Sequence, residues 1–589
     1  MKNLKRTHYN TELAVENIGE TVCVMGWVQK MRHKGALIFI DLRDRTGIIQ
    51  IALGDHSDRE VFETAKKLRS EFVIAAVGTV KSRGADVNLD RKTGAIEIDA
   101  ENIVIFSEAN TPPFEIEEDS NVNEELRLKY RYLDLRRPSL NSNIIFRHNV
   151  QRVTRDYFYD NGFIDIETPN LIKPTPEGAR DYLVPSRVHN GKFYVLPQSP
   201  QIYKQLLMAS GFDRYFQIAR CYRDEDLRAD RQPEFTQIDL EMSFVDEDEI
   251  FEMMEGYIKT LFSKISNIDI DTPLLRMTYE ECMTRYGSDK PDLRFGYELV
   301  DVTDISKNTS FKVFSEASAV KGIIIDEDFP RKEIDALTEY VKTYKAKGLA
   351  WYKNSETPTS SYSKFLTDEE NQQILDLFGA KQGDTIFIVA DNDIDVVHAS
   401  LGALRCEIAR RKNKIPQGVI KPLFVTDFPM FERGEDEQGN VVWHAKHHPF
   451  TMPKLDEFEK YIDSDPSKIN ARAYDIVING FELGSGSIRI NNPELQHKIL
   501  NFLGYDEEIA NERFGFLLES YKYGVPQHGG FGLGLDRLVT VMLGLTSIRD
   551  VIAFPKVQNA SELMSGAPHF AEPQALEELG IAVVKEEKE

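Results

Sequence analysis

Three separated segments of the 589-residue chain combine arginines, carboxylates and glycines in patterns that suit the chemistry of phosphate and carboxylate groups. In the first, residues 216–244, polar and apolar residues alternate as they do in strands, whose successive side chains point to opposite faces. Four side chains of its second predicted strand share one face: Phe235, Gln237, Asp239 and Glu241. An antiparallel first strand would add Arg223 and Glu225 to that surface. A merely solvated sheet face shows the same pattern, so the spacing alone leaves both interpretations open.

The second segment, residues 474–490, sets acids among apolar residues and glycines. Asp475 and Glu482 lie in this context, and Arg489 follows them. A buried carboxylate is costly unless a cation compensates it, and Mg²⁺ bound to phosphate oxygens is a suitable cation. We therefore expect a metal and phosphate site at these acids.

The third segment is the glycine-rich run 529–534, which precedes an apolar stripe at helical spacing. Glycines before a helix start let a phosphate approach backbone N–H groups and the positive end of the helix dipole. Asp536 and Arg537 lie at that start. A dinucleotide site is disfavoured, because no strand, helix and strand with an acid about 20 residues on can be recognised. Plain packing of a helix on a strand explains the glycines better.

Histidines and cysteines give little support for a transition metal. His444, His447 and His448 contain one adjacent pair without a shared face or a further soft ligand. The four cysteines lie far apart and form no CxxC pair: Cys23, Cys221, Cys282 and Cys406. We expect reduced thiols and no structural zinc.

A small barrel is the first element that can position functional residues. Residues 21–107 predict three strands, a helix and two strands, which is the order of an OB-fold barrel. The expected strands are 21–32, 37–45, 48–54, 72–83 and 96–107, with the helix at 59–69. The first strand runs into the basic turn 29–34 and the second carries Phe39, which together offer cations and an aromatic ring to single-stranded bases. A solvated turn beside a core phenylalanine is the alternative.

The rest of the chain predicts a larger domain with an insertion. Residues 111–122 are rich in proline and acids, as in a linker. A helix is expected over 143–161 and a strand over 163–167. Strands at 322–326 and 385–390 and helices at 331–347 and 397–413 predict a self-contained unit. We therefore divide the chain into a barrel (1–110), a linker (111–140), a first half-domain (141–286), an α/β insertion (287–422) and a second half-domain with a C-terminal extension (423–589).

Composition limits the classes of protein and partner. With 41% hydrophobic and 29% charged residues the chain is an ordinary globular protein. It has no apolar run near the roughly 18 residues that span a bilayer and no secretory signal, so we expect a cytoplasmic protein without a membrane partner. The net charge of −24 opposes nucleic acid binding. Basic residues are nevertheless concentrated, because residues 1–50 carry eight Lys or Arg against five acids and residues 127–155 carry eight against one.

The three segments resemble motifs 1, 2 and 3 of the class II aminoacyl-tRNA synthetases. Four fuller strings resemble the bacterial-type aspartyl-tRNA synthetases across nearly the whole chain: TPEGARDYLVP (175–185), PQSPQIYKQ (197–205), FTQID (235–239) and GLDR (534–537). The insertion resembles the domain that is characteristic of this bacterial type. The resemblance implies an α+β multidomain fold with an OB-fold anticodon-binding barrel and a class II antiparallel sheet with helices. It also implies that L-aspartate is activated with ATP to an adenylate, releasing pyrophosphate, and then transferred to the 3′ end of tRNA(Asp).

The resemblance assigns roles toward ATP and Mg²⁺. Arg223 would hold the α-phosphate, Arg537 the γ-phosphate, and Phe235 would stack on adenine. The implied ATP-binding residues are Arg223, Asp224, Glu225, Gln232, Phe235, Glu482, Gly534, Leu535, Asp536 and Arg537. The implied catalytic residues are Arg223, Glu225, Glu482 and Arg537. Asp475 and Glu482 would hold Mg²⁺, and positioning with charge neutralisation would carry the phosphoryl transfer.

The resemblance also assigns the amino acid site. The implied aspartate-binding residues are Glu177, Ser199, Gln201, Lys204, Arg223, Asp239, His447, His448 and Arg489. Lys204 and Arg489 would hold the side-chain carboxylate, with one of the two adjacent histidines closing over it. Asparagine would leave this buried pair unmatched, and sites of that kind reject such analogues by roughly 10⁴ to 10⁵. No editing domain is then required.

The barrel would read the anticodon. The implied contacts are Arg32, His33, Phe39, Gln50, Asp86 and Glu97, some of them at positions where family members vary. A non-discriminating form that also aspartylates tRNA(Asn) is therefore an alternative. Members of the family are homodimers, and the helix before Pro169 would lie at the interface.

Two further alternatives remain. An asparaginyl- or lysyl-tRNA synthetase shares the barrel and core, but Lys204 with Arg489 and the insertion speak against both. A synthetase-like RNA-binding regulator without catalysis would have lost Arg223, Glu482 or Arg537, and the chain has all three.

Overall fold

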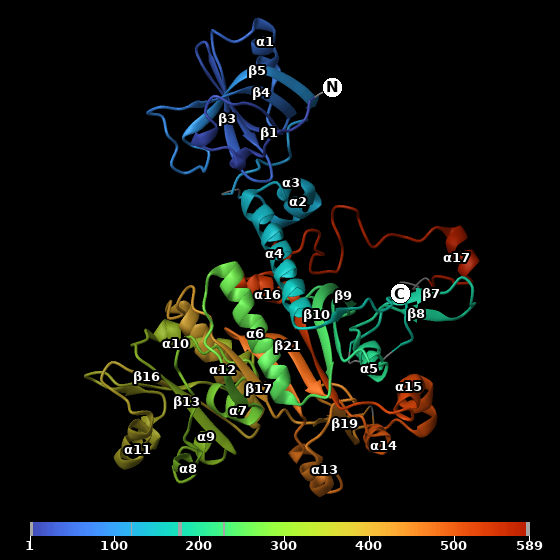
Figure 1. The fold of residues 1–589 in the computed structure, drawn as a ribbon. Coiled ribbons are helices and arrows are strands. Elements are labelled where there is room, and N and C mark those ends of the chain that lie inside the picture. The colour runs from blue at the N-terminus through green and yellow to red at the C-terminus, as the bar shows by residue number, and fades with distance from the viewer. Residues whose placement is uncertain (1–3, 119–120, 175–178, 228–229, 437, 585–589) are drawn as a thin grey trace. The chain divides into compact units, whose positions relative to one another are not determined.

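The structure is a computed structural model that describes residues 4–118, 121–174, 179–227, 230–436 and 438–584. Two compact units share the chain. One comprises Met1–Phe146, Arg549–Val557 and Ser561–His569, and the other comprises Arg147–Ile548, Gln558–Ala560 and Phe570–Glu589. The first boundary falls inside helix α4 (Pro138–Asp160), drawn in Figure 1. Across the described ranges, no helix combines the length and the apolarity needed to cross a membrane.

The first unit contains a closed five-stranded barrel in the order β1-β2-β3-β5-β4. Its strands are β1 (Thr21–Lys34), β2 (Leu37–Arg43), β3 (Ile48–Leu53), β4 (Val73–Ser82) and β5 (Ile96–Ser107). Helix α1 (Arg59–Lys67) lies between β3 and β4 in the chain, and the carboxylate of its N-cap Asp58 accepts from two backbone N–H groups. Alternate residues of the strands, such as Val24, Ile40 and Ile98, fill the core. The predicted OB-fold order of elements is confirmed.

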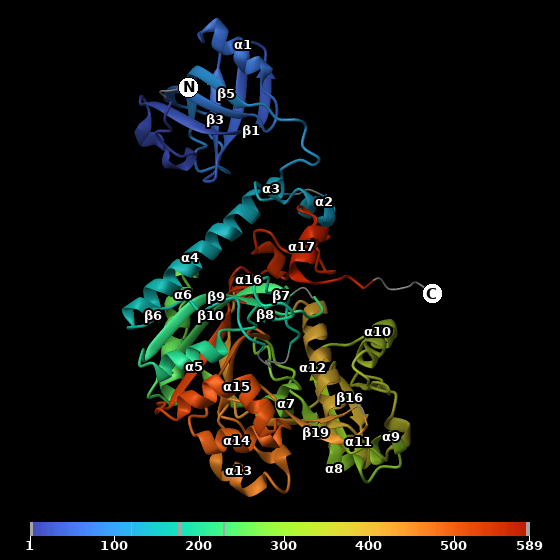
Figure 2. The same cartoon turned by 90° about the vertical axis from the view of Figure 1, so that its right-hand side faces the viewer.

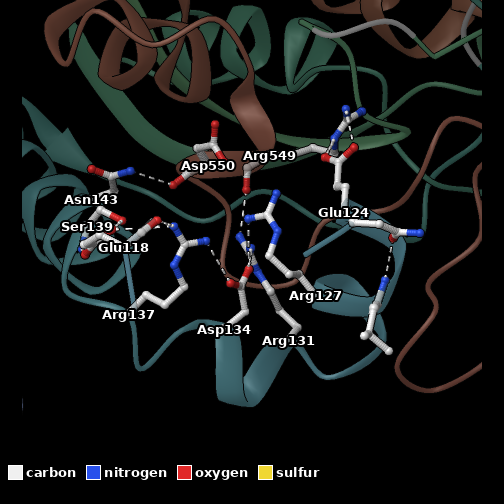
Figure 3. Close-up of polar contacts among 12 residues, drawn as sticks. Glu118, Glu124, Arg127, Arg131, Asp134, Arg137, Ser139, Asn143, Arg549 and Asp550 are labelled. Carbon is white, nitrogen blue, oxygen red and sulfur yellow. Dashed lines mark hydrogen bonds and ion pairs between the residues drawn. The ribbon is translucent and has the colours of Figure 1, made fainter. Parts of the chain in front are cut away.

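Short helices and the chain's late segment form a polar cluster (Figure 3) and belong to the same unit as the barrel. The helices are α2 (Glu124–Lys129), α3 (Arg131–Asp134) and the start of α4. Arg131 donates from Nε to Ala553 O (2.9 Å) and from Nη2 to Arg549 O (2.8 Å). Its Nη1 lies 2.9 Å from the buried carboxylate of Asp134. The segment after residue 548 is therefore bonded to the linker helices.

The second unit is built on an eight-stranded sheet in the order β11-β17-β20-β21-β22-β10-β9-β6. The strands are β6 (Ile164–Asp165), β9 (Arg214–Tyr222), β10 (Glu234–Ser243), β11 (Leu275–Thr278), β17 (Pro422–Thr426), β20 (Ala473–Ile478), β21 (Phe481–Ile488) and β22 (His528–Gly534). All neighbours are antiparallel except the two edge pairs, β11 with β17 and β6 with β9. Two hairpins accompany this sheet, β7 (Leu183–Pro185) with β8 (Phe193–Val195) and β18 (Phe431–Glu435) with β19 (Val441–Ala445).

Helices cover the sheet and bury its apolar face. They are α5 (Gln201–Ala209), α6 (Glu247–Ser266), α7 (Tyr279–Tyr286), α13 (Leu455–Tyr461), α14 (Pro493–Phe502), α15 (Glu507–Tyr521) and α16 (Leu535–Met542). A further helix of this unit, α17 (Pro573–Leu579), contributes no buried residue. Phe251 of α6 stacks on Phe424 of β17 at 4.4 Å between ring centroids. Figure 2 shows α13, α14 and α15 grouped apart from the helices of the insertion.

The insertion has its own antiparallel sheet in the order β12-β13-β16-β14-β15. Its strands are β12 (Val300–Asp301), β13 (Ala319–Ile325), β14 (Ala350–Lys353), β15 (Thr359–Ser360) and β16 (Thr385–Asp391). Its helices are α8 (Thr303–Ser306), α9 (Lys312–Ser315), α10 (Arg331–Lys342), α11 (Asp368–Phe378) and α12 (Ile394–Arg411). Separate apolar clusters lie on the two sides of β13 and β16. The predicted mixture of strands and helices in this segment is confirmed, and the segment belongs to the same compact unit as the eight-stranded sheet.

Two element predictions need correction. Strand β9 ends at Tyr222, so Arg223 and Glu225 lie in the loop beyond it, because Asp224 N bonds Arg180 O instead of continuing the ladder. Helix α4 begins at Pro138, five residues before the amphipathic pattern predicts, since proline is well accommodated at a first helical position. The glycine run 529–534 is a central strand followed directly by α16, in agreement with the favoured interpretation of a helix packed on a strand.

Candidate active site

Two small pockets adjoin on the polar face of the eight-stranded sheet. The larger, about 270 Å³, is lined by Arg223, Glu225, Asp230, Arg231, Gln232, Phe235, Gln237, Glu482, Leu483, Gly484, Ser485, Gly532, Gly534, Asp536, Arg537 and Ile548. The smaller, about 160 Å³, is lined by Ser199, Gln201, Lys204, Arg223, Gln237, Asp239, His447, His448, Ser485, Gly486, Ser487, Arg489 and Gly532. Arg223 and Gln237 line both. We call the larger one the nucleotide pocket and the smaller one the amino acid pocket.

The nucleotide pocket presents arginines beside an aromatic ring. The guanidinium of Arg223 lies 5.1 Å from the centroid of the Phe235 ring, and its buried Nε has no hydrogen-bond partner in the described chain. Arg537 Nη1 donates to Glu482 O (3.1 Å), and Nη2 lies 3.2 Å from the half-exposed carboxylate of Asp230. Both guanidinium groups thus line a pocket that can receive phosphates.

Three residues predicted to bind ATP have other positions or partners. Asp224 and Leu535 do not line the pocket, and Leu535 is fully buried because it belongs to the apolar face of α16. Asp536 lines the pocket, but its carboxylate is bonded to Arg147 and to the backbone N–H of Thr236. Asp536 therefore links α16 to β10 and to Arg147 of α4.

The two acids predicted to hold Mg²⁺ lie on adjacent strands, Asp475 on β20 and Glu482 on β21. Burial and the nearby Glu482 carboxylate raise the pKa of Asp475 well above its usual range. Its buried Oδ1 has no hydrogen-bond partner in the described chain. Two carboxylates that destabilise each other's charge in this way fit a cation. Within the described ranges, no group of three or more His, Cys, Asp or Glu could hold a metal ion.

Two buried cations of the amino acid pocket, Lys204 and Arg489, share the carboxylate of Glu241 as a partner. Lys204 Nζ lies 3.3 Å from Glu241 Oε2, and Arg489 Nε donates to Glu241 Oε1 (2.9 Å). Burial opposes ionisation of Glu241, but Arg489 and Lys204 together lower the pKa of this carboxyl. Lys204 and Arg489 therefore share an ionised partner at the wall of the pocket.

Asp239 is the other acid of this pocket. Its Oδ1 lies 2.9 Å from Lys204 Nζ. Complete burial raises the pKa of Asp239 to about 6, although Lys204 opposes the shift. Asp239 and the amide of Gln201, whose Nε2 is unpaired in the described chain, can receive a ligand's ammonium and carboxylate groups.

The two adjacent histidines have different environments. His448 Nε2 accepts from Arg489 Nη1 (2.7 Å), since an arginine can only donate. His447 contacts Phe428 edge to face at 4.9 Å, and its Nε2 is unpaired in the described chain. Burial and nearby cations lower the pKa of His447 to about 4 and hold that of His448 well below its usual value, so both rings are neutral at pH 7. His448 is a partner of Arg489, whereas His447 is available to a ligand.

The glycines of β22 make room for the functional side chains of β10. Gly530 is paired with Glu241 and Gly532 with Asp239 across the two strands. A Cβ on Gly530 would collide with the Glu241 carboxylate, and one on Gly532 with the amide of Gln237. The glycine run thus serves close approach by side chains of the neighbouring strand.

The structure brings together all the described residues predicted to bind aspartate, whereas Glu177 lies outside the described residues. Sequence reasoning missed several residues of the site, among them Gln237, Glu241, Ser485 and Ser487. The parity of β10 placed Gln237 and Glu241 on the correct face. No signal in the sequence indicated that the Glu241 carboxylate would be buried instead of solvated.

The barrel brings together three of the predicted anticodon contacts. Arg32 donates to Asp41 (2.8 and 2.9 Å) and to Gln50 Oε1 (3.0 Å), and Gln50 Nε2 donates to Glu97 (2.6 Å). Phe39 lies directly across from Arg32 in the β1–β2 pair. Two predicted contacts, His33 and Asp86, are exposed, the first at the end of β1 and the second in the loop after β4. Asp41 and Arg91, which are 3.0 Å apart, were not predicted.

Comparisons with known families cover most of the chain. Residues 123–558 match the family described as tRNA synthetases class II (D, K and N). Residues 22–106 match the OB-fold nucleic acid binding domain of the anticodon-binding type.

Individual relatives are similar over their full length. The aspartate–tRNA ligase of Ruminiclostridium cellulolyticum is 57% identical over 592 residues, which cover 99% of either chain. The aspartate–tRNA(Asp/Asn) ligase of Lachnoclostridium phytofermentans is 54% identical over 100% of this chain and 99% of its own. Among solved structures, the aspartyl tRNA synthetase of Entamoeba histolytica has a TM-score of 0.58 at 20% identity, covering 94% of this chain and 91% of its own. At that identity the likeness concerns the fold alone, and it agrees with the predicted α+β multidomain architecture.

Proposed function

Because the chain belongs to the class II tRNA synthetases of the D, K and N type, we propose that it ligates L-aspartate to tRNA in two ATP-dependent steps. The observation that carries this function is the junction of the two pockets at Arg223 and Gln237. A carboxylate in the amino acid pocket and the α-phosphate in the nucleotide pocket would meet there. Arg223, with an unpaired Nε, is placed to neutralise the charge that develops between them.

In the first step a carboxylate oxygen of aspartate attacks the α-phosphorus, and pyrophosphate leaves. Phe235 would stack on the adenine ring, while Arg537 would bind the terminal phosphates. In the second step the 3′ hydroxyl group of tRNA attacks the acyl carbon of aspartyl-adenylate, and AMP leaves. Binding and orientation by these residues supply the main contribution to the rate.

Asp475 and Glu482 fit a divalent cation, because one carboxylate oxygen is buried and unpaired and the two charges destabilise each other. We assign Mg²⁺ to these acids together with phosphate oxygens. When bound, it would supply charge neutralisation to the phosphates.

Selectivity for aspartate would come from Lys204 and Arg489. Glu241 contacts both cations and Asp239 contacts Lys204. The side-chain carboxylate of aspartate would give Lys204 and Arg489 a charged acceptor, whereas the carboxamide of asparagine would give them an uncharged one. His447, which has a free Nε2, is the histidine that would close over the bound amino acid. These features support aspartate over asparagine or lysine.

The tRNA substrate would be tRNA(Asp), read by the barrel face around Arg32, Phe39 and Gln50. Relatives named aspartate–tRNA ligase and relatives named aspartate–tRNA(Asp/Asn) ligase are both similar to the chain, so tRNA(Asn) is a second proposed substrate. With tRNA as its substrate the chain would act in the cytoplasm. We also propose a homodimer, supported by exposed apolar side chains at the end of α4 and on β6, among them Tyr159 and Ile164.

The test is ATP–pyrophosphate exchange with Mg²⁺ and without tRNA, offering aspartate, asparagine, glutamate and lysine separately. We expect exchange with aspartate alone. Arg223→Ala is expected to abolish exchange without unfolding the chain. No exchange with any amino acid would favour the second candidate, an RNA-binding regulator, against which the pocket shared by Arg223, Glu482 and Arg537 speaks.

A further inference from the structure

The insertion contains a buried lysine that the proposed function does not use. Lys321 lies on β13 and is only 4% exposed. Its Nζ is 3.1 Å from Nε2 of His398 on α12. The nearest carboxylate oxygen that pairs with it belongs to Asp301 and lies 3.9 Å away, beyond hydrogen-bond reach.

This environment is poor for a charged ammonium group. An ammonium group has three donors, and in the described chain Lys321 makes one hydrogen bond, to a neutral acceptor. Burial lowers the pKa of Lys321, with Asp301 opposing the shift. Burial and the charge of Lys321 lower the pKa of His398 to about 4. A charged ammonium group is therefore poorly compensated here, and Lys321 loses its proton more readily than an ordinary lysine does.

A cavity of about 790 Å³ opens beside the pair. The insertion contributes Lys321, His398 and Asp301, and the main domain contributes residues of α7 and α13, including Lys460. No residue of this cavity lines the nucleotide or amino acid pocket. A small molecule can thus reach the amine without entering the proposed active site.

The charge of the cavity limits what can enter. Six carboxylates line it against three lysines: Glu280, Asp301, Asp395, Asp427, Asp456 and Glu457 against Lys321, Lys460 and Lys468. Anionic reagents are therefore disfavoured relative to neutral ones. A buried amine with an adjacent base in a cavity is the arrangement of an activated nucleophile.

We propose that Lys321 is an acylation site, at which its Nζ takes a short acyl group from a neutral acyl thioester within this cavity. The Nζ lone pair attacks the thioester carbonyl, the C–S bond breaks and an amide forms. His398 Nε2 receives the proton from Nζ, and the leaving thiolate takes up a proton to become a thiol. The product no longer carries a buried charge, which favours acylation at this position.

The probe is S-acetyl-N-acetylcysteamine, a neutral acetyl thioester, incubated at pH 7.5 with the full-length chain. Mass spectrometry of digests then gives the initial acetylation rate at each lysine. Lys460 is the internal control, because it lines the same cavity but is exposed and lies over the ring of Tyr461 instead of beside a base. We expect Lys321 to react at least about tenfold faster than Lys460. A rate at Lys321 equal to or below that at Lys460 would overturn the proposal and leave Lys321 a structural residue.

Two further experiments test the role of His398 and the preference for a neutral donor separately. His398→Gln keeps a hydrogen-bonding side chain but cannot take a proton, so the rate at Lys321 should fall about tenfold while that at Lys460 stays unchanged. Unchanged exchange of ATP with pyrophosphate would show that the variant is folded. With anionic acetyl phosphate as the donor, the ratio of the Lys321 rate to the Lys460 rate should fall. An unchanged ratio would overturn the assignment to neutral donors, and an unaffected rate in His398→Gln would remove the histidine from the step.

Discussion

Glu241 is the residue on which the amino acid pocket depends most. It is completely buried and contacts both Lys204 and Arg489, which line the pocket, although Glu241 itself does not. Arg489 in turn binds Ser487 and His448. Glu241 therefore acts as a positioning residue, because it fixes the two cations that would bind the substrate carboxylate.

We expect Glu241→Gln to raise the KM for aspartate by roughly 100-fold and to lower stability by about 3–5 kcal/mol, because two buried cations lose their shared counter-charge. Pyrophosphate exchange measures the first effect and thermal unfolding the second. Glu255→Gln is the matched control, since Glu255 is also buried but accepts from Leu274 N (3.0 Å) outside both pockets. It should lose stability with its KM unchanged. An unaltered KM in Glu241→Gln would contradict the positioning role.

Asp239 gives the pocket a pH dependence. Its pKa is raised to about 6 by burial, and only the ionised carboxylate attracts the substrate ammonium. As the pH falls below 6 the carboxyl gains a proton, so kcat/KM for aspartate should fall about tenfold per pH unit. His447, with a pKa of about 4, does not titrate in that range. Exchange rates between pH 5 and 8 test this, and Asp239→Asn should show low activity without the acidic limb. A flat wild-type profile from pH 5 to 7 would refute the assignment.

The sequence predicted eight residues of the amino acid pocket and eight of the sixteen that line the nucleotide pocket, because the motifs that contain them are dense and specific. It could not identify Glu241 as part of the site, because strand parity gives the face of a residue but not its burial. It also could not show that Asp536 is bonded to Arg147, a residue 389 positions away. Contacts of this kind depend on the completed packing of distant segments.

At the scale of elements, β22 shows how glycines in one strand make room for the side chains of its neighbour. They lie opposite Glu241 and Asp239 of β10 and leave space for the Glu241 and Gln237 side chains. The sequence left two interpretations of the glycine run, a phosphate approaching the backbone before a helix and the favoured packing of a helix on a strand. The pairing of β22 with both β10 and β21 agrees with the second interpretation, because the glycines belong to the sheet.

The linker helices are bonded to a segment far away in the sequence, the residues after 548, and Arg131 donates the hydrogen bonds between them (Figure 3). We expect Arg131→Met to destabilise this unit by about 3–5 kcal/mol, because Asp134 loses its closest buried partner and three carbonyl groups lose their donor. The readouts are the thermal midpoint and the rate of proteolysis within residues 549–557.

Arg127→Met provides the comparison for Arg131. Arg127 belongs to the same cluster but lies 3.6 Å from Asp134 and is more exposed, so its loss should cost less than about 1 kcal/mol. Equal effects of the two substitutions would mean that the bonds from Arg131 to the late segment contribute little.

At the scale of the molecule, the order of elements along the chain was predictable, whereas the use of the insertion was not. Its strands and helices follow from local patterns, and the observed β13, β16, α10 and α12 overlap the predicted ranges. Lys321 and His398, by contrast, are 77 residues apart and gave no joint signal in the sequence. Their contact results from the packing of α12 on β13, a tertiary property.

The division into two units predicts that tRNA recognition and aspartate activation can be separated by substitution. Phe39 lies on the barrel face across from Arg32, so Phe39→Leu removes an aromatic platform while keeping an apolar side chain. Base stacking is worth about 1–3 kcal/mol, so we expect the KM for tRNA(Asp) to rise by roughly 5- to 100-fold with pyrophosphate exchange unchanged. Phe62→Leu is the control, because Phe62 lies on α1 and packs against the barrel core.

Aminoacylation kinetics with tRNA(Asp) and tRNA(Asn) would also show whether both substrates depend on the ring of Phe39. If Phe39→Leu left both KM values unchanged, the anticodon would have to be read by another surface of the barrel, whereas a loss of exchange would mean that the two units are not functionally separable.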